Sequence, residues 1–254
     1  MTPDGGQAGD GHKADAGESQ AGDGHRADAG ENGPGGRRLT ERQRQREILR
    51  LLASRYQGIG SALEFQSPYQ LLVATALAAQ TTDAQVNKVT RRLFADYPNA
   101  ASMAGVTPET LIPYIQSLGL YRNKAKNIAA LAELLLFRFD GQVPKTREEL
   151  TQLPGIGRKT ANVVLANAFN IPALAVDTHV FRVANRLRLA AGKTPDEVEA
   201  QLCRLIPRRD WSDAHHWLIW HGRRCCKARQ PDCPLCPAAA LCPHALGESD
   251  GALK

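Results

Sequence analysis

The end of the chain carries a cluster of cysteines. Four of the six cysteines lie in the stretch CKARQPDCPLCPAAALC, separated by six, two and five residues. Such crowding is typical of a metal site, but four-cysteine zinc sites usually pair two short arms across a longer loop. One compact run with three unequal spacings suits an iron–sulfur cubane, in which each iron takes one thiolate. The spacing therefore favours a 4Fe–4S cluster over zinc, with the ligands Cys226, Cys233, Cys236 and Cys242.

The other two cysteines are not expected to bind the metal. Cys203 falls on the apolar side of a helix expected over 195–206, near Val198 and Leu202, and is interpreted as a small buried hydrophobic residue. Cys225 adjoins a predicted ligand but breaks the spacing, so it is left out of the ligand set.

A second stretch with chemical potential is LPGIGRKTANVV at 153–164. It places two cations at the start of an apolar helix, where unpaired N–H groups and the positive end of the helix dipole disfavour each cation by about 0.3–1 kcal/mol. Gly155 and Gly157 are expected to allow a tight turn before this helix and close approach of a ligand. Either the cations Arg158 and Lys159 are incidental, or an anion meets this turn, with a DNA phosphate as the candidate if the chain binds DNA.

The charge of the chain is unevenly distributed. The formal net charge is +6, but residues 1–36 hold seven acids and two bases, which leaves thirty bases and nineteen acids, or +11, for residues 37–254. So basic a region predicts a polyanionic partner, and nucleic acid is the leading candidate. The alternative is a basic surface that only keeps the protein soluble. The sequence shows neither an apolar run near the roughly 18 residues of a membrane span nor a signal peptide, which predicts a soluble intracellular protein.

The acidic N-terminal segment is a repeat. QAGDGHKADAGES at 7–19 recurs as QAGDGHRADAGEN at 20–32. It is rich in Gly, Asp and Ala, and it has too few large apolar side chains to offset the entropy of ordering. We expect residues 1–38 to form a disordered acidic tail and residues 247–254 a flexible C-terminus.

From Leu39 onward the pattern is helical. Apolar residues recur at three- and four-residue intervals, and Gly119 and Gly141 mark helix ends. Helix starts are predicted at Ser67-Pro68 and at three capping-box patterns, which are Thr82 with Gln85, Thr146 with Glu149 and Thr194 with Glu197. No stretch has the pattern of a convincing strand, so we predict an all-α fold.

Several motifs together resemble the endonuclease III family of DNA glycosylases. They are LPGIGRKTANVV, VDTHVFRVANRL with Asp177 lying 18 residues after Lys159, HHWLIWHGR and the cysteine run, and they span roughly residues 40–245. The resemblance implies two helical domains that flank a DNA-binding cleft. One is a six-helix barrel with a helix-hairpin-helix at 61–171, and the other is an iron–sulfur cluster domain formed by 39–60 and 172–246.

The resemblance also implies a bifunctional DNA glycosylase and abasic-site lyase acting on oxidised pyrimidines in duplex DNA. Lys159 would attack C1′, expel the base and form a Schiff base, and β-elimination would then nick the strand. Asp177 would accept a proton or stabilise the cationic sugar. Its place before THVFRVANRL also predicts a helix N-cap, and the two roles are compatible.

Further residues match family positions beside the DNA. Gln80 and Leu120 would fill the space left by a flipped base, and His179 would line the base pocket. Lys227 and Arg229 follow the first cluster ligand and could reach phosphates, although Gln230 stands where relatives often carry a base. Trp217 and Trp220, in HHWLIWHG, are expected in the core of the cluster domain.

Three other functions stay open on sequence grounds. A monofunctional adenine-mismatch glycosylase would lack lysine at position 159 and usually carries a further C-terminal domain. A noncatalytic lesion-binding iron–sulfur protein would need no nucleophile, and an iron–sulfur electron carrier would need no basic cleft. We expect a cytoplasmic, nucleoid-associated monomer whose partner is duplex DNA containing damaged pyrimidines or abasic sites.

Overall fold

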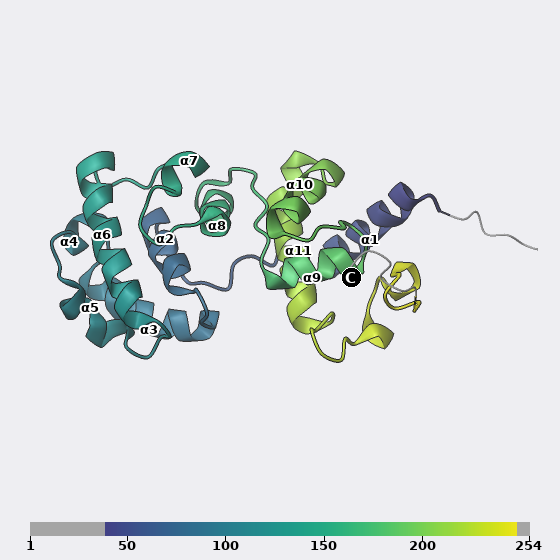
Figure 1. Ribbon diagram of the computed structural model, residues 1–254, viewed down its shortest axis with the longest axis horizontal. Helices are drawn as coiled ribbons and strands as arrows, with labels where there is room; N and C mark the ends of the chain where they lie inside the picture. The colour runs from purple at the N-terminus through teal and green to yellow at the C-terminus, as the bar shows by residue number, and fades with distance from the viewer. Residues whose placement is uncertain (1–38, 248–254) are drawn as a thin grey trace, which may run out of the picture. The chain divides into compact units, whose positions relative to one another are not determined.

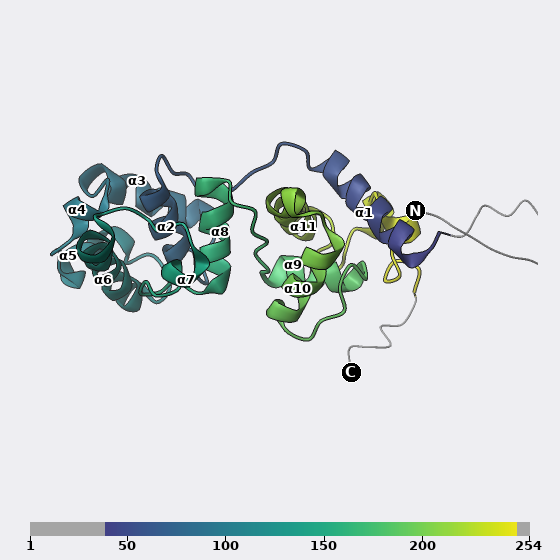
Figure 2. The same cartoon turned by 90° about the horizontal axis from the view of Figure 1, so that it is seen from above.

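The computed structural model describes residues 39–247, so the predicted N-terminal tail and nearly all of the predicted flexible C-terminus lie outside the described residues. Within 39–247 every regular element is a helix and no strand occurs, which confirms the all-α prediction. These helices fall into two groups, each built around its own apolar core (Figures 1 and 2).

The first group surrounds a core of apolar residues between Leu63 and Ala173. The helix α2 packs against α8, and α6 packs against α4 and α5. Two of the helices, α4 and α7, are turns of four residues each. The bounds are α2 Pro68–Leu77, α3 Asp83–Asp96, α4 Ala100–Met103, α5 Pro108–Ile115, α6 Tyr121–Phe139, α7 Arg147–Leu150 and α8 Arg158–Phe169.

The second group joins the first helix to the C-terminal part of the chain. Its core combines Ile48, Leu49, Leu52 and Tyr56 with apolar residues between Leu174 and Cys242. The helix α11 packs against both α9 and α1. The bounds are α1 Glu41–Arg55, α9 Thr178–Arg186, α10 Pro195–Leu205 and α11 Trp211–Arg224, with the 3₁₀-helices η1 Arg208–Asp210, η2 Cys233–Leu235 and η3 Ala239–Leu241.

Side-chain caps mark most of the predicted helix starts. Four side chains accept a hydrogen bond from the backbone N–H three residues later, as predicted: Ser67, Thr82, Thr146 and Thr194. The predicted capping boxes are wrong in their second half, since Gln85 donates to Ser117 Oγ, Glu149 accepts from the Thr146 hydroxyl and Glu197 accepts from the Lys193 N–H. The helix α8 differs, because it begins after Gly157 without a side-chain cap. Its first N–H groups are therefore left for another acceptor.

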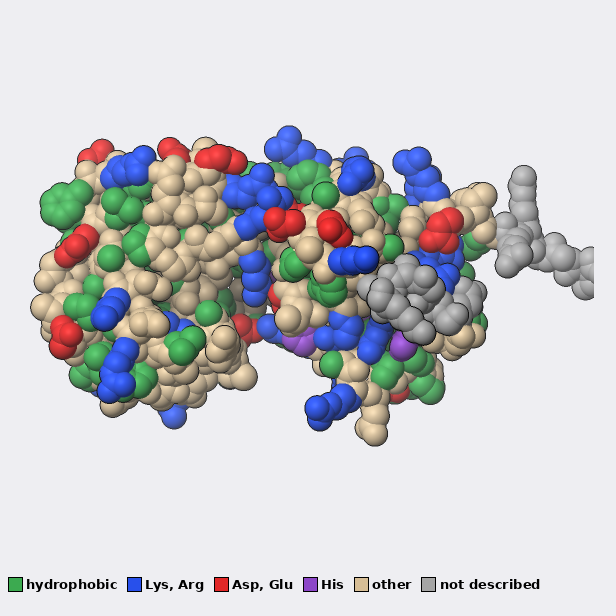
Figure 3. Space-filling view, in the orientation of Figure 1, with side chains coloured by type: hydrophobic (Ala, Val, Ile, Leu, Met, Phe, Trp, Pro, Cys, Tyr) green, Lys and Arg blue, Asp and Glu red, His purple; other side chains and the backbone are tan. Residues whose placement is uncertain are grey.

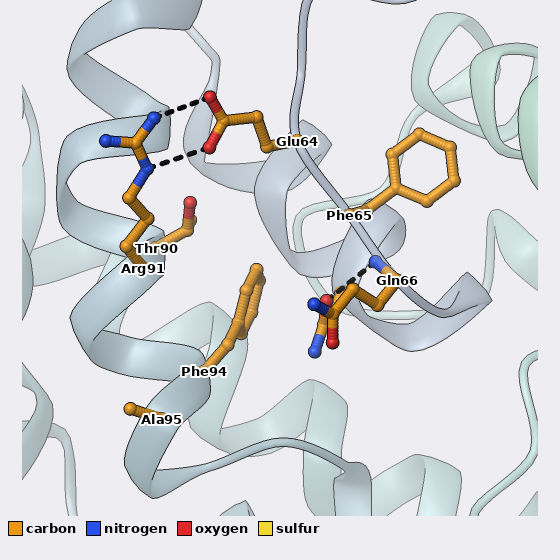
Figure 4. Close-up of a pocket in the computed structure, with 8 residues that line it drawn as sticks. Glu64, Phe65, Gln66, Thr90, Arg91, Phe94 and Ala95 are labelled. Atoms are coloured by element: carbon orange, nitrogen blue, oxygen red, sulfur yellow. Dashed lines mark hydrogen bonds and ion pairs between the residues drawn. The ribbon is translucent and has the colours of Figure 1, made fainter.

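A hollow of about 300 Å³ on the first group contains none of the predicted site residues (Figure 4). Its acid and its base bind each other, because Arg91 Nε and Nη2 donate to the two oxygens of Glu64 at 2.8 and 2.7 Å. Both side chains are more than half exposed, so this pair contributes little to stability. Among the described helices, none has the combined length and apolar character needed to cross a bilayer.

Candidate active site

Lys159 and Asp177 line the same pocket although they belong to different groups of helices. Lys159 is the second residue of α8 and is exposed, and Asp177 directly precedes α9 and is half-buried. The pocket has a volume of about 80 Å³. The fold thus brings together the two residues predicted to be catalytic. The other polar residues that line the pocket include Asp83, Asn167, His215, His216, Trp220 and Arg223.

The two glycines before α8 have different conformations. Gly155 has a φ of +78°, and a Cβ at this position would lie 2.9 Å from Asn127 Nδ2, so both backbone and space require glycine here. Gly157 has a φ of −95°, and a Cβ there would meet open space. The expectation that both glycines form the tight turn is therefore wrong for Gly157, which lies in extended backbone and leaves room for a ligand.

Asp177 uses one carboxylate oxygen to cap a helix. Its Oδ1 accepts from the backbone N–H groups of His179 at 2.9 Å and Val180 at 2.8 Å, which confirms the predicted N-cap of α9. Among the described residues, no group donates to its Oδ2. The capping role and a role toward a ligand can therefore be divided between the two oxygens of one side chain.

Arg158 is paired with an acid on another helix. Its Nε and Nη2 donate to the two carboxylate oxygens of Glu199 on α10, at 2.9 and 2.7 Å. Its Nε also lies 3.6 Å from Asp196 Oδ1. Its assignment as a DNA contact stays a prediction, but in this structure its guanidinium already has an acidic partner.

Two buried histidines behind Lys159 and Asp177 were not predicted as site residues. His215 is buried with its Nδ1 2.8 Å from the Ala175 carbonyl oxygen, so Nδ1 carries the proton. Burial, together with the neighbouring His216, lowers the pKa of His215 to about 4. His216 Nε2 lies 2.9 Å from Asn167 Oδ1. The pair at the start of HHWLIWHG was the available signal, but the sequence could not show that its rings face a pocket.

The two tryptophans of this motif are half-buried against the second core. Trp220 also lines the pocket, and its Nε1 donates to the Gly60 carbonyl at 3.2 Å. The prediction that both tryptophans belong to this core therefore describes only part of the environment of Trp220.

Gln80 and Leu120 are exposed at loops with a shared conformation. Both have left-handed backbone, with φ of 55° and 58°, which is uncommon outside glycine. Leu120 is 57% exposed and is not the core leucine that its type would suggest. The loop of Gln80 is tied to the helix that follows Leu120, because the buried Lys124 on α6 donates from Nζ to Thr81 Oγ1 at 2.9 Å.

His179 lies near one of these loops. It lines a second pocket of about 580 Å³ together with Gln80, Asp83 and Arg223. Its Nδ1 lies 3.2 Å from Arg182 Nη2, and this arginine also donates to the carbonyl oxygens of Gly222 and Cys226. Arg182, which is also on α9, thus holds the His179 ring beside this pocket.

The four predicted cysteine ligands line one small cavity: Cys226, Cys233, Cys236 and Cys242. Burial raises the pKa of the Cys236 thiol to about 12 and also raises that of Cys242. A bound cation reverses this effect, because a coordinating thiol loses its proton. Arg186 adds positive charge, with Nη1 3.6 Å from Cys226 Sγ, and it donates to the Lys227 carbonyl at 2.7 Å. This set of donors fits a metal site that takes thiolates.

Two further residues reach this cavity. Cys225 Sγ, His221 and Cys236 Sγ have ligand atoms within 4.8 Å of one another. His221 is fully buried, with its two ring nitrogens 3.2 Å from the Tyr56 hydroxyl and 3.6 Å from Cys236 Sγ. The exclusion of Cys225 from the ligand set stays a prediction, and His221 was not predicted from the sequence. Lys227 and Arg229 are exposed in the loop after Cys226, whereas Cys203 is half-buried against the second core.

One face of the molecule is rich in basic side chains (Figure 3). On the face shown in Figure 3, Lys and Arg side chains gather where the two groups of helices meet and over the group of α1, α9, α10 and α11. This distribution agrees with the excess of bases counted from the sequence and suits a polyanionic ligand.

Comparison with known proteins identifies the family. Residues 73–208 match the model of the HhH-GPD superfamily base excision DNA repair protein family. Endonuclease III of Synechocystis sp. is 48% identical over 207 residues, which cover 81% of this chain and 94% of the relative. Endonuclease III of Escherichia coli K12 is 45% identical over 198 residues, which cover 78% and 94%.

Solved structures agree with this result. A trapped covalent intermediate of endonuclease III with DNA superposes with a TM-score of 0.79 at 45% identity, covering 82% of this chain and 99% of the other. With the pocket and the cysteine site in place on a matching fold, the chain belongs to the HhH-GPD superfamily of base excision DNA repair proteins and, within it, to the endonuclease III family.

Proposed function

We propose that this protein excises oxidised pyrimidines from duplex DNA, with Lys159 as nucleophile and Asp177 as its electrostatic partner. As a member of the endonuclease III family, it is a DNA glycosylase and abasic-site lyase of base excision repair, and it binds DNA. The observation that carries the residue assignment is the shared pocket, into which α8 brings an exposed amine and the start of α9 brings a carboxylate. No other lysine lines this pocket.

The chemistry begins with the neutral amine of Lys159. Its nitrogen lone pair forms a bond to C1′ while the C1′–base bond breaks, and the departing base keeps the electron pair and takes up a proton. The sugar ring opens as the nitrogen forms a Schiff base. Loss of a C2′ proton then expels the 3′ phosphate, which cuts the strand.

Asp177 would act through the oxygen that does not cap the helix. As the base leaves, positive charge develops on the sugar, and a carboxylate held in advance stabilises that charge without reorganisation. Because Oδ1 is fixed by two backbone N–H groups, Oδ2 keeps a constant position beside the pocket. The neutral His215 behind it supplies no competing charge.

Other residues would hold the DNA. The first N–H groups of α8, next to Gly157 and after the turn at Gly155, would bind a phosphate, because they lack a protein cap. Gln80 and Leu120 would fill the space left by the flipped nucleotide, which suits exposed side chains held on left-handed backbone. His179 would line the base pocket, and Lys227 and Arg229 would meet phosphates.

We further propose that the metal site holds a 4Fe–4S cluster on Cys226, Cys233, Cys236 and Cys242, and that it stabilises the domain formed by 39–60 and 172–246 beside a barrel at 61–171. Four thiols around one cavity, with a guanidinium nearby, support this assignment. We also predict that the protein acts as a monomer in the cytoplasm, on nucleoid DNA.

Borohydride trapping on a duplex with an abasic site tests the assignment of the nucleophile. The wild-type protein should become linked to DNA, because borohydride reduces the imine to a stable amine. Lys159→Gln keeps a long polar side chain, so it should keep folding and DNA binding but give no adduct. Lys193→Gln, an exposed lysine outside the pocket, is the matched control and should be trapped normally. An adduct of normal yield from Lys159→Gln would show that another amine is the nucleophile.

A further inference from the structure

Glu199 is a buried acid that does not line the pocket, and its closest partner among the described residues is Arg158. The side chain of Glu199 is 10% exposed. Its Oε2 accepts from Arg158 Nε at 2.9 Å, and its Oε1 accepts from Arg158 Nη2 at 2.7 Å and from Arg147 Nη1 at 3.4 Å. A buried carboxylate is costly unless it is paired, and the two-bond fork with arginine is the geometry that best satisfies it.

The pair connects the two groups of helices at the nucleophile. Arg158 is the first residue of α8, whose Ala161 and Val164 are buried in the first core. Glu199 lies on α10, whose Val198 and Leu202 are buried in the second core. A shift between α8 and α10 would therefore move Lys159 relative to Asp177, because these two belong to the same two groups of helices.

The same contact explains how a cation is tolerated at this helix start. The positive end of the α8 dipole favours an acid and disfavours Arg158. Glu199, on a different helix, pairs its carboxylate with the guanidinium of Arg158. The carboxylate of Asp196 lies 3.6 Å from the same guanidinium. If Arg158 turned to a DNA phosphate instead, the buried Glu199 would lose its main partner.

We propose that Arg158 and Glu199 form an inter-helix clamp that positions Lys159 against Asp177, and that Arg158 does not bind a DNA phosphate. The two residues are positioning residues, since neither lines the pocket. The inference rests on the proposed function of Lys159 and adds to it. A displacement of about 1 Å at a reacting group can lower a rate about 100-fold, so loss of the clamp should appear in the chemical step.

The test separates the rate of imine formation from DNA affinity. Single-turnover trapping at saturating abasic-site duplex gives the rate constant, and binding titrations at several salt concentrations give Kd and its salt dependence. Glu199→Gln and Arg158→Gln should each lower the rate constant about tenfold or more, with Kd changed less than about twofold. The double variant should be no slower than the singles, because both remove the same contact.

A phosphate contact would give the opposite pattern. Arg158→Gln would then weaken binding and reduce the salt slope by about one phosphate, while Glu199→Gln would free Arg158 and tighten binding. Either of these changes in DNA binding, with a rate constant equal to that of the wild type, would refute the clamp. Arg91→Gln and Glu64→Gln break a fork of the same kind that is exposed and lies within the first group (Figure 4), so they should change neither quantity.

Two further measurements protect the result against loss of folding. Arg158→Lys keeps the charge beside Glu199 but not the two-bond fork, so it should stay folded and still slow the chemical step. Helical circular dichroism at the assay temperature must match the wild type in each variant. A wild-type protein that gave no adduct would refute the proposed chemistry itself, whereas normal trapping of the wild type and of Arg158→Lys at equal rates would refute only the clamp.

Discussion

Asp177→Asn should separate helix capping from catalysis. Asparagine keeps the Oδ1 acceptor used by the His179 and Val180 N–H groups, but it replaces Oδ2 with an amide and removes the charge. The lost charge at the start of α9 should cost about 0.3–1 kcal/mol of folding stability. Asp177→Ala loses both hydrogen bonds and should cost about 1–2 kcal/mol.

The effects of the two substitutions on activity should differ in pattern from their effects on stability. Loss of one preorganised charge partner typically costs about 2.7–4 kcal/mol in the transition state, which is about 100- to 1,000-fold in rate. Asp177→Asn and Asp177→Ala should therefore both release the base at least about 100-fold more slowly, although their stabilities differ. Cleavage of a preformed abasic site should be slowed less, because no base has to leave.

The assay compares single-turnover base release from an oxidised-pyrimidine duplex with urea unfolding of the same samples. Thr107→Ala is the matched control, because it removes the N-cap of α5 outside the pocket and should cost about 1 kcal/mol of stability without slowing base release. Wild-type base release by Asp177→Asn would refute the electrostatic role. Equal destabilisation by asparagine and alanine would refute the division of roles between the two oxygens.

Three further predictions test the metal site, the turn and the buried histidine. Protein purified anaerobically should contain about four irons per chain, and Ser substitution at each predicted ligand should lower the iron content while Cys203→Ser should not; stoichiometric zinc without iron would contradict this. Gly155→Ala should cost about 1–2 kcal/mol in urea unfolding because its φ is +78°, whereas Gly157→Ala should fold normally and weaken binding to damaged and undamaged duplex alike. The pKa of His215 is lowered from 6.5 to about 4, so protonation of this ring favours the unfolded state. The free energy of unfolding should therefore be unaffected by this group above pH 6.5 and should fall by about 3 kcal/mol as the pH decreases toward 4. His215→Asn should show a smaller loss of stability than the wild type between pH 7 and pH 5, and an equal loss would contradict the assignment.

The helix starts, including the cap at Asp177, could be predicted because their signals are local. Ser67 before Pro68 is a capping pattern within two positions, and the structure places the cap there. Asp177 before THVFRVANRL likewise predicted a cap that the structure confirms. Each of these signals depends on backbone geometry that neighbouring residues set among themselves.

Contacts between distant residues gave no such signal. Arg158 and Glu199 are 41 positions apart, and nothing in GIGRKT indicates that an acid on a later helix will take the guanidinium. The left-handed backbone of Gln80 and Leu120 was also unpredictable, since glycine or asparagine usually marks that conformation. His215 is similar, because a histidine in an apolar helix has the same pattern whether its ring faces a core or a pocket.

The two cations at the start of α8 therefore have separate explanations. Consecutive residues of a helix point roughly 100° apart, so Arg158 and Lys159 leave the helix in different directions. Arg158 faces an acid supplied by α10, which offsets the helix dipole and connects the two groups of helices. Lys159 lines the pocket with Asp177 and has no capping side chain before it, because position 157 is glycine. Under the two proposals Arg158 holds the helix in place while Lys159 stays available for reaction, and a single cation at this turn could not do both.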